Sequence, residues 1–140
     1  MKFTKLALSA SLILLCLTSQ ASDNEKRPHE TVTPNFMREI PNIPGKSMIT
    51  AVVTYPPKGA SPSHHHAKSA FIYAFVLEGE IRSSVDGSAP RIYKAGESWY
   101  EDPGAHHTVS ENASDSKPAR LLAVFIVDTG DKQLTVPDGQ

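Results

Sequence analysis

The 140-residue chain has a single cysteine, Cys16, and it lies in an apolar stretch near the N-terminus. Removal of that stretch on export would leave a mature chain without cysteine. Disulfide bonds, thiolate metal ligands and a cysteine nucleophile are then excluded. Because no cysteine remains, any metal site in the mature chain must use nitrogen and oxygen ligands. The sequence also lacks sustained helical periodicity, tandem repeats and low-complexity tracts.

The N-terminus has the three parts of a secretory signal. Lys2 and Lys5 precede a short apolar run, Leu6 to Leu17, and Ser19-Gln20-Ala21 offers small residues at the −3 and −1 positions of a cleavage site. A membrane anchor is the alternative, but the run is too short to span a bilayer comfortably. We expect cleavage near Ala21 and a periplasmic or secreted protein that has no membrane attachment after the signal is removed.

Neither sign of charge is in large excess. The chain has 14 basic and 15 acidic residues, and loss of Lys2 and Lys5 with the signal leaves 12 against 15, a net charge of −3. This balance gives no reason to expect nucleic acid as a partner. Roughly 120 residues remain, enough for one domain. The expected organisation is a signal peptide at 1–21, an N-terminal arm and edge strand at 22–46, a barrel at 47–130 and a C-terminal tail at 131–140.

Short runs rich in β-branched and aromatic residues recur along the chain, separated by Gly, Pro, Asp and Asn. Gly79 suits a bulge or bend, and Asp86-Gly87 is a strong hairpin signal. The polar stretch from Ser22 to about Pro34 is expected to be a mobile arm. Strands are predicted at 35–40, 47–55, 71–77, 81–85, 91–93, 98–100, 107–109 and 121–127, the last buried on both faces. The pattern predicts an all-β sandwich or closed barrel.

Five of the six histidines lie in two clusters, His64-His65-His66 and His106-His107. Alternate side chains of a strand share a face, so His64 and His66 would project together and His65 would point away. The two imidazoles could share a metal ion with a nitrogen from the second cluster. A surface patch with low metal affinity is the alternative. The position of the second cluster, after a Pro-Gly turn between strands, favours ligands.

Two segments resemble the motifs of the cupin superfamily. Gly59-Ala-Ser-Pro-Ser-His64-His-His66, followed by Phe75-Val-Leu-Glu-Gly79, is similar to the first motif, and Gly96-Glu-Ser-Trp-Tyr-Glu-Asp-Pro-Gly104-Ala-His-His107 is similar to the second. The resemblance covers roughly residues 47 to 128. It implies a small single-domain antiparallel barrel of jelly-roll type, with a metal ion held by inward-pointing side chains.

Carried over by position, the resemblance implies His64, His66 and His107 as metal ligands. His106 is the alternative if the loop is one residue shorter. The second motif departs slightly from the family pattern, because Asp102 stands in place of its proline and the asparagine arrives one place late, at Asn112.

The glutamate of the first motif is missing. Its expected positions, Ala70 to Ile72, are apolar, and Glu78 and Glu80 lie too far along to serve as ligands. The expected donor set is three neutral imidazoles with water, which leaves the full divalent charge and favours anionic ligands such as enolates or carboxylates. Ligand type does not choose among Fe, Zn, Ni, Cu and Mn.

Several aromatic residues are candidates for a wall beside the metal, although core packing explains Phe75 better than a ligand contact does. Trp99 and Tyr100 alternate, so one of them faces inward. No titratable residue stands out as a general base, and no hydrolase triad is visible. The candidates are Tyr73, Phe75, Trp99 and Tyr100.

The leading hypothesis is an exported metal-binding cupin that acts on or binds a small oxygen-rich or anionic molecule, as a dioxygenase by analogy with three-histidine iron cupins. A non-enzymatic binding module and a metal-dependent isomerase or lyase remain the alternatives. Because cupin barrels often pair through edge strands, a homodimer is expected by the same analogy.

Overall fold

The computed structural model describes residues 27–139, and the expected signal peptide lies outside these residues. The described chain is all-β, and no helix in it could span a membrane. Two five-stranded antiparallel sheets have the orders β1-β2-β9-β4-β7 and β10-β3-β8-β5-β6. The strands are β1 (Thr31–Glu39), β2 (Lys46–Tyr55), β3 (His64–His66), β4 (Phe71–Glu78), β5 (Glu80–Val85), β6 (Arg91–Lys94), β7 (Ser98–Glu101), β8 (His106–Asn112), β9 (Ala119–Asp128) and β10 (Thr135–Pro137).

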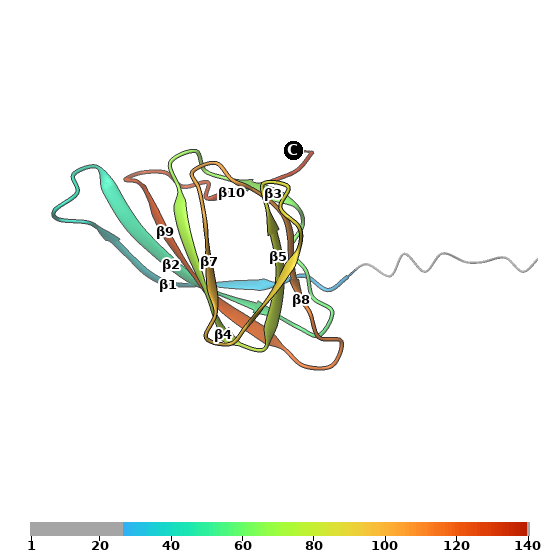
Figure 1. Ribbon diagram of the computed structural model, residues 1–140. Helices are drawn as coiled ribbons and strands as arrows, with labels where there is room; N and C mark the ends of the chain where they lie inside the picture. Colours follow the sequence, from blue (N-terminus) through green and yellow to red (C-terminus); the bar gives the residue numbers. More distant parts are fainter. Residues whose placement is uncertain (1–26, 140) are drawn as a thin grey trace, which may run out of the picture.

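The two sheets face each other and enclose the interior of a barrel (Figure 1). The pairing of β2 with β9 is the longest, running from Lys46 opposite Asp128 to Tyr55 opposite Ala119. Strictly alternating burial along β9 directs one face inward. The inward side chains of β4, β7 and β9 form most of the core, which includes Ile72, Val76, Trp99, Leu121, Phe125 and Val127. The all-β jelly-roll prediction is confirmed.

Two predicted turn signals are confirmed. Asp86 and Gly87 both have positive φ, 50° and 73°, as a two-residue turn between antiparallel strands requires. Gly79 has φ 72°, and a Cβ there would lie 2.7 Å from the carbonyl oxygen of Pro118. The β4–β9 register shifts just before it, between Val76 and Glu78. Only glycine fits this bend between β4 and β5.

Both ends of the described chain carry more structure than we predicted. Strand β1 begins at Thr31, inside the stretch expected to be a mobile arm. The residues before it are tied to the barrel, because Arg27 pairs with Glu111 and the amide of Ala60 donates to the carbonyl of Pro28 (3.0 Å). The stretch expected as a tail contributes β10, which pairs with β3. Strand β10 has only three residues, Thr135–Pro137, which is too short for a recognisable strand pattern in the sequence.

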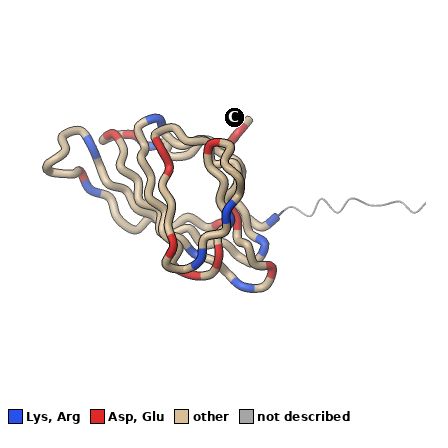
Figure 2. The backbone as a smooth tube through the Cα atoms, viewed as in Figure 1, with Lys and Arg blue, Asp and Glu red and all other residues tan. Residues whose placement is uncertain are grey.

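The outer face of the β1–β7 sheet is partly apolar. Side chains on it are exposed, among them Phe71, Tyr73 and Tyr100, and β9 is only half-buried on this side, so the prediction that it is buried on both faces is wrong. Lysine, arginine, aspartate and glutamate are interspersed along the described chain, without a long stretch of one sign (Figure 2). This agrees with the near balance of charge in the sequence.

Candidate metal centre

A cavity of about 460 Å³ lies inside the barrel, between the two sheets. Its space comes from a row of small side chains: Ala51, Ala123 and Ala74 lie side by side across β2, β9 and β4, and Trp99 of β7 follows in the same row. All four line the cavity. Because alanine ends at Cβ, the inner face of the sheet is hollowed there instead of filled.

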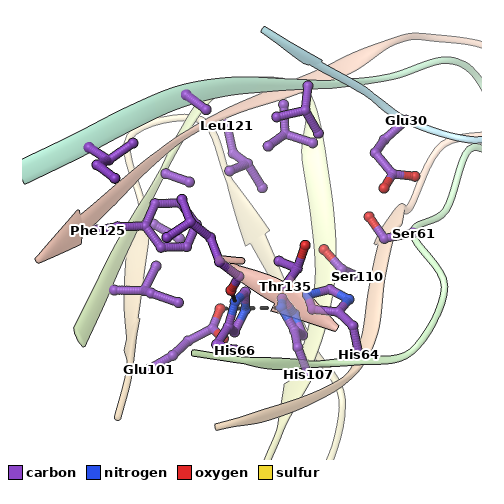
Figure 3. Close-up of a pocket in the computed structure, with 18 of the residues that line it drawn as sticks. Glu30, Ser61, His64, His66, Glu101, His107, Ser110, Leu121, Phe125 and Thr135 are labelled. Carbon is purple, nitrogen blue, oxygen red and sulfur yellow. Dashed lines mark hydrogen bonds and ion pairs between the residues drawn. The ribbon is translucent and has the colours of Figure 1, made fainter. Parts of the chain in front are cut away.

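The three histidines implied by the family resemblance meet at one end of this cavity (Figure 3). In the β3–β8 pairing His64 lies opposite His107, and His66 is two residues along β3 on the same face. One ring nitrogen of each lies within 4.8 Å of the others. His66 and His107 are buried and His64 is half-buried. His106, the alternative ligand, lies opposite His65 and points out of the cavity with it.

Backbone carbonyls fix the orientation of two of these rings. His64 Nδ1 donates to the carbonyl of Pro62 (2.7 Å), and His66 Nδ1 donates to the carbonyl of Leu134 (3.2 Å). Since a carbonyl oxygen only accepts, both Nδ1 atoms carry the proton, and in the neutral rings Nε2 keeps a free lone pair. Metal-binding histidines are commonly held in this way.

A carboxylate that the sequence reasoning missed lies among the imidazoles. Glu101 Oε2 is 3.0 Å from His66 Nε2, and Glu101 Oε1 is 3.2 Å from His107 Nδ1. Trp99 Nε1 donates to the same Oε1 (3.0 Å), and the Ser83 hydroxyl is hydrogen-bonded to His107 Nε2 (2.9 Å). The sequence reasoning did not anticipate this buried carboxylate, which contacts two of the three rings.

Burial controls the charge of the cluster. Loss of hydration lowers the pKa of His64 and lowers that of His107 to about 4, so both rings are neutral at pH 7. Burial alone would raise the pKa of Glu101, but its contacts with His66 and His107 outweigh that effect and lower the pKa. At neutral pH the cluster thus holds the neutral rings of His64 and His107 and the ionised carboxylate of Glu101.

This donor set fits a divalent cation. His66 Nε2 and Glu101 Oε2 are both buried and lack a hydrogen-bond partner, although they face each other at 3.0 Å. Two lone-pair atoms in that position repel each other unless a proton or a cation lies between them. Imidazole nitrogen with carboxylate oxygen is a common donor set for zinc, iron and related ions.

The aromatic wall differs from the predicted one. Of the four candidates only Trp99 lines the cavity, while Tyr73, Phe75 and Tyr100 face outward from β4 and β7. Phe125 of β9 also lines the cavity, and its ring centroid is 5.8 Å from that of His66. The half-buried Phe75 is not a ligand contact.

A second polar region lines the cavity. The buried Tyr55 hydroxyl is hydrogen-bonded to Ser110 (2.7 Å) and Ser61 (2.9 Å), and burial raises the pKa of Tyr55 to about 12. Glu30, from the stretch expected to be mobile, also lines the cavity, and its Oε2 is buried without a hydrogen-bond partner. No sequence pattern in this segment predicted that it reaches the interior.

The second-motif asparagine has a structural role. Asn112 is buried, and its side-chain amide donates to the carbonyls of Pro56 (3.0 Å) and Lys117 (2.7 Å). Its Oδ1 accepts from the amide of Ser114 (2.9 Å). The side chain holds two loops together at the end of β8, away from the imidazoles.

The sequence matches the family described as Cupin domain over residues 51–125. This protein is a cupin. The match spans more than half of the chain and includes His64, His66, Glu101 and His107. The predicted family membership is confirmed.

Curated relatives include two plant cupins. Germin-like protein 1 of Brassica napus is 36% identical over 62 residues, which are 44% of this chain and 30% of the relative. Germin-like protein 9-3 of Oryza sativa subsp. japonica is 30% identical over 99 residues, 68% of this chain and 45% of the relative. This cupin therefore spans less than half the length of these relatives.

Among solved structures, a recombinant oxalate oxidase in complex with glycolate matches with a TM-score of 0.58 at 23% identity. The match covers 77% of this cupin and 54% of the oxidase chain. At this identity the likeness supports the shared fold and leaves the substrate open.

Proposed function

We propose that this cupin binds one divalent metal ion through His64, His66, His107 and Glu101, and that the ion coordinates the oxygen donor group of a small organic molecule in the cavity. The observation that carries the proposal is that His66 Nε2 and Glu101 Oε2 are buried, face each other at 3.0 Å and have no other hydrogen-bond partner. The orientation of His64 and His66 by backbone carbonyls supports it.

Glu101 changes the electrostatics expected from the sequence. Three neutral imidazoles would leave the ion with two positive charges, whereas the carboxylate reduces the net charge of the centre to one. A ligand with one anionic oxygen group, such as a carboxylate or an enolate, then neutralises it. We propose a monoanion as the preferred ligand.

The residues that line the cavity indicate the polarity of the part of the ligand that does not bind the metal. Polar side chains of the lining lie at the imidazole end, at the hydroxyls of Tyr55, Ser61 and Ser110, at Glu30, and in the segment that carries Lys132, Gln133 and Thr135. Most of the remaining lining is apolar. A wholly polar dianion would leave that apolar surface without a partner. The cavity better suits an aliphatic or aromatic molecule with an oxygen donor at one end and a hydrogen-bonding group at the other. The apolar residues include Ile49, Val53, Ile72, Leu121, Phe125 and Leu134.

A bound divalent ion would supply Lewis acidity and, if it were iron, the ability to bind O₂. On that basis we propose oxidation of the ligand by O₂ as the reaction. Glu30 and the Tyr55 hydroxyl are the groups able to bind the far end of the substrate, and Trp99 and Phe125 exclude water beside the imidazoles. Export of the protein and its homodimeric state remain predictions.

Metal analysis of the full chain, purified without a tag, is the first test. We expect one ion per cavity, lost in each of the variants His64→Gln, His66→Gln and His107→Gln and kept in His29→Gln, which changes the histidine outside both clusters. Iron together with ligand-dependent oxygen uptake supports the oxidation. Zinc or nickel without oxygen uptake would instead favour the isomerase or the binding module. Normal metal content in all three cavity variants would refute the site.

A further inference from the structure

A second cluster of metal-binding side chains lies on the outside of the barrel. His65 of β3 lies opposite His106 of β8, and their rings stack with centroids 4.0 Å apart and planes within 6°. Asp138, which directly follows β10, meets both rings. Three strands from distant parts of the sequence thus place two imidazoles and a carboxylate together.

The distances among these groups suit a shared ion. His65 Nδ1 is 3.1 Å from Asp138 Oδ1, and His106 Nε2 is 2.8 Å from Asp138 Oδ2. One candidate ligand atom of each residue lies within 4.8 Å of the other two. Ligands about 2.0–2.2 Å from a tetrahedral zinc ion are about 3.3 Å from one another. Small side-chain adjustments would therefore bring all three onto one ion.

The cluster is held in place by its neighbours. The Ser63 hydroxyl donates to Asp138 Oδ2 (2.6 Å), and the amide of Asp138 donates to the carbonyl of Ser63 (2.9 Å). The amide of His106 donates to Asp86 Oδ1 (2.8 Å). The hydrogen bonds from Ser63 and His106 lower the pKa of Asp138 to about 2, so the carboxylate is ionised at neutral pH.

The cluster is also open enough to bind an ion from solution. The side chains of His65, His106 and Asp138 are 54%, 35% and 39% exposed. Water can therefore fill the coordination positions that the protein leaves vacant. The groups in the cavity are a separate set, because alternation along β3 directs His64 and His66 inward and His65 outward.

We propose that His65, His106 and Asp138 form a second divalent-metal site, on the outer surface, that takes zinc or another ion suited to imidazole and carboxylate ligands. The site is independent of the ion proposed for the cavity. It joins Asp138, the residue that follows β10, to β3 and β8.

An ion at this outer site would stabilise the segment from Asp131 to Asp138, which covers one part of the cavity. Leu134, Thr135 and Pro137 line the cavity, and the Leu134 carbonyl orients His66. Asp138 is the next residue after β10. A ligand that binds only the ordered arrangement stabilises it, so metal at Asp138 holds the segment from Asp131 to Asp138 against the barrel.

Zinc titration of the metal-free full chain, without a tag, tests the outer site. Native mass spectrometry and calorimetry should count two zinc ions per wild-type chain and in His29→Gln, and one in each of His65→Gln, Asp138→Asn and His64→Gln. The affinity of the remaining ion in the two outer variants should match that of the cavity site. Melting temperatures of the metal-free variants confirm that each is folded.

Proteolysis supplies a second readout. Lys132 is exposed within the segment that covers the cavity, so trypsin can cut after it. Zinc should slow this cleavage at least fivefold in the wild type and in His64→Gln, and should have no such effect in Asp138→Asn. This measurement remains informative even if one outer variant folds poorly.

The two proposals fail in different ways. If His65→Gln and Asp138→Asn bind as many zinc ions as the wild type, and zinc does not protect Lys132, the outer site is refuted. If instead the wild type binds one ion, which is lost in Asp138→Asn and kept in His64→Gln, the cavity site is refuted and the outer site stands.

Discussion

Ile72 and Glu101 lie directly opposite each other on the neighbouring strands β4 and β7, and both side chains point into the cavity. Ile72 is one of the positions where the cupin pattern leads one to expect a glutamate. The carboxylate is thus absent from that strand and present on the next one at the paired position. Side chains paired across strands share a face and have Cβ atoms about 4.5–5.5 Å apart.

Glu101→Gln should weaken metal binding in the cavity by about tenfold or more, because the charge is lost while the side chain keeps its size. The amide oxygen of the glutamine can still accept from Trp99 Nε1, so the fold should be retained. Competition with a chelator of known affinity measures the change. Glu97, whose side chain is 42% exposed, gives the matched control, since it does not line the cavity.

A glutamate at position 72 should replace Glu101 as the carboxylate of the metal site and restore the metal affinity. The single variant Glu101→Ile should bind metal weakly, and the double variant Ile72→Glu/Glu101→Ile should recover most of the affinity. The paired register places a glutamate at 72 on the same face. Chelator competition on both variants measures it. A double variant as weak as the single one would show that the two positions are not equivalent.

The metal-free protein should lose stability as the pH falls from about 6.5 to 4. The pKa of His107 is about 4 in the folded chain and about 6.5 when unfolded, so the unfolded state takes up protons first. Above pH 6.5 the ring is neutral in both states, and the free energy of unfolding is at its full value. As the pH falls to 4, preferential protonation of the unfolded state lowers the free energy of unfolding by up to about 3 kcal/mol. His64 acts in the same direction.

Urea unfolding of the metal-free protein at pH 7 and at pH 4.5 measures this loss. In His107→Gln the side chain cannot titrate. The free energy of unfolding of this variant should therefore differ clearly less between pH 7 and pH 4.5 than that of the wild type. An equal pH dependence in the variant and the wild type would contradict the assignment to His107.

A larger side chain in the alanine row of β2, β9 and β4 should prevent binding of the organic ligand in the cavity without reducing the metal content. Ala123→Leu adds a side chain in the middle of the alanine row, one inward-facing position along the sheet from the row that contains Phe125, Ile72 and Glu101. We expect the metal content to stay normal and ligand-dependent activity or binding to fall at least tenfold. Ala113→Leu, on the half-buried loop after β8, controls for the added bulk. Unchanged ligand binding would place the ligand elsewhere.

The fold was predictable because the signals are local. Dense β-branched runs, the Asp86-Gly87 turn and the bend at Gly79 each act through their own backbone, and the structure keeps all of them. The grouping of His64, His66 and His107 followed from strand alternation together with the family resemblance. Strand alternation also separates His65 from its two neighbours.

The parts that were missed depend on pairing between distant segments. Glu101 became relevant only through its register with Ile72, although its alternation with the inward-facing Trp99 was a usable sign. Glu30 and Leu134 reach the cavity from segments with no strong strand pattern. The wrong aromatic wall has a related cause, since residue type alone does not decide which face of a strand is the inner one.

The hydrogen bond from His66 to the Leu134 carbonyl makes the last part of the chain a component of the cavity. That carbonyl is 68 residues away from the ring that it orients, so His66 is held in place only after the segment that carries Leu134 has been made and has folded against β3. Metal loading should accordingly follow folding instead of guiding it. A shortened chain ending before Leu134 would leave an edge strand carrying loosely held histidines, prone to capture metal with little selectivity.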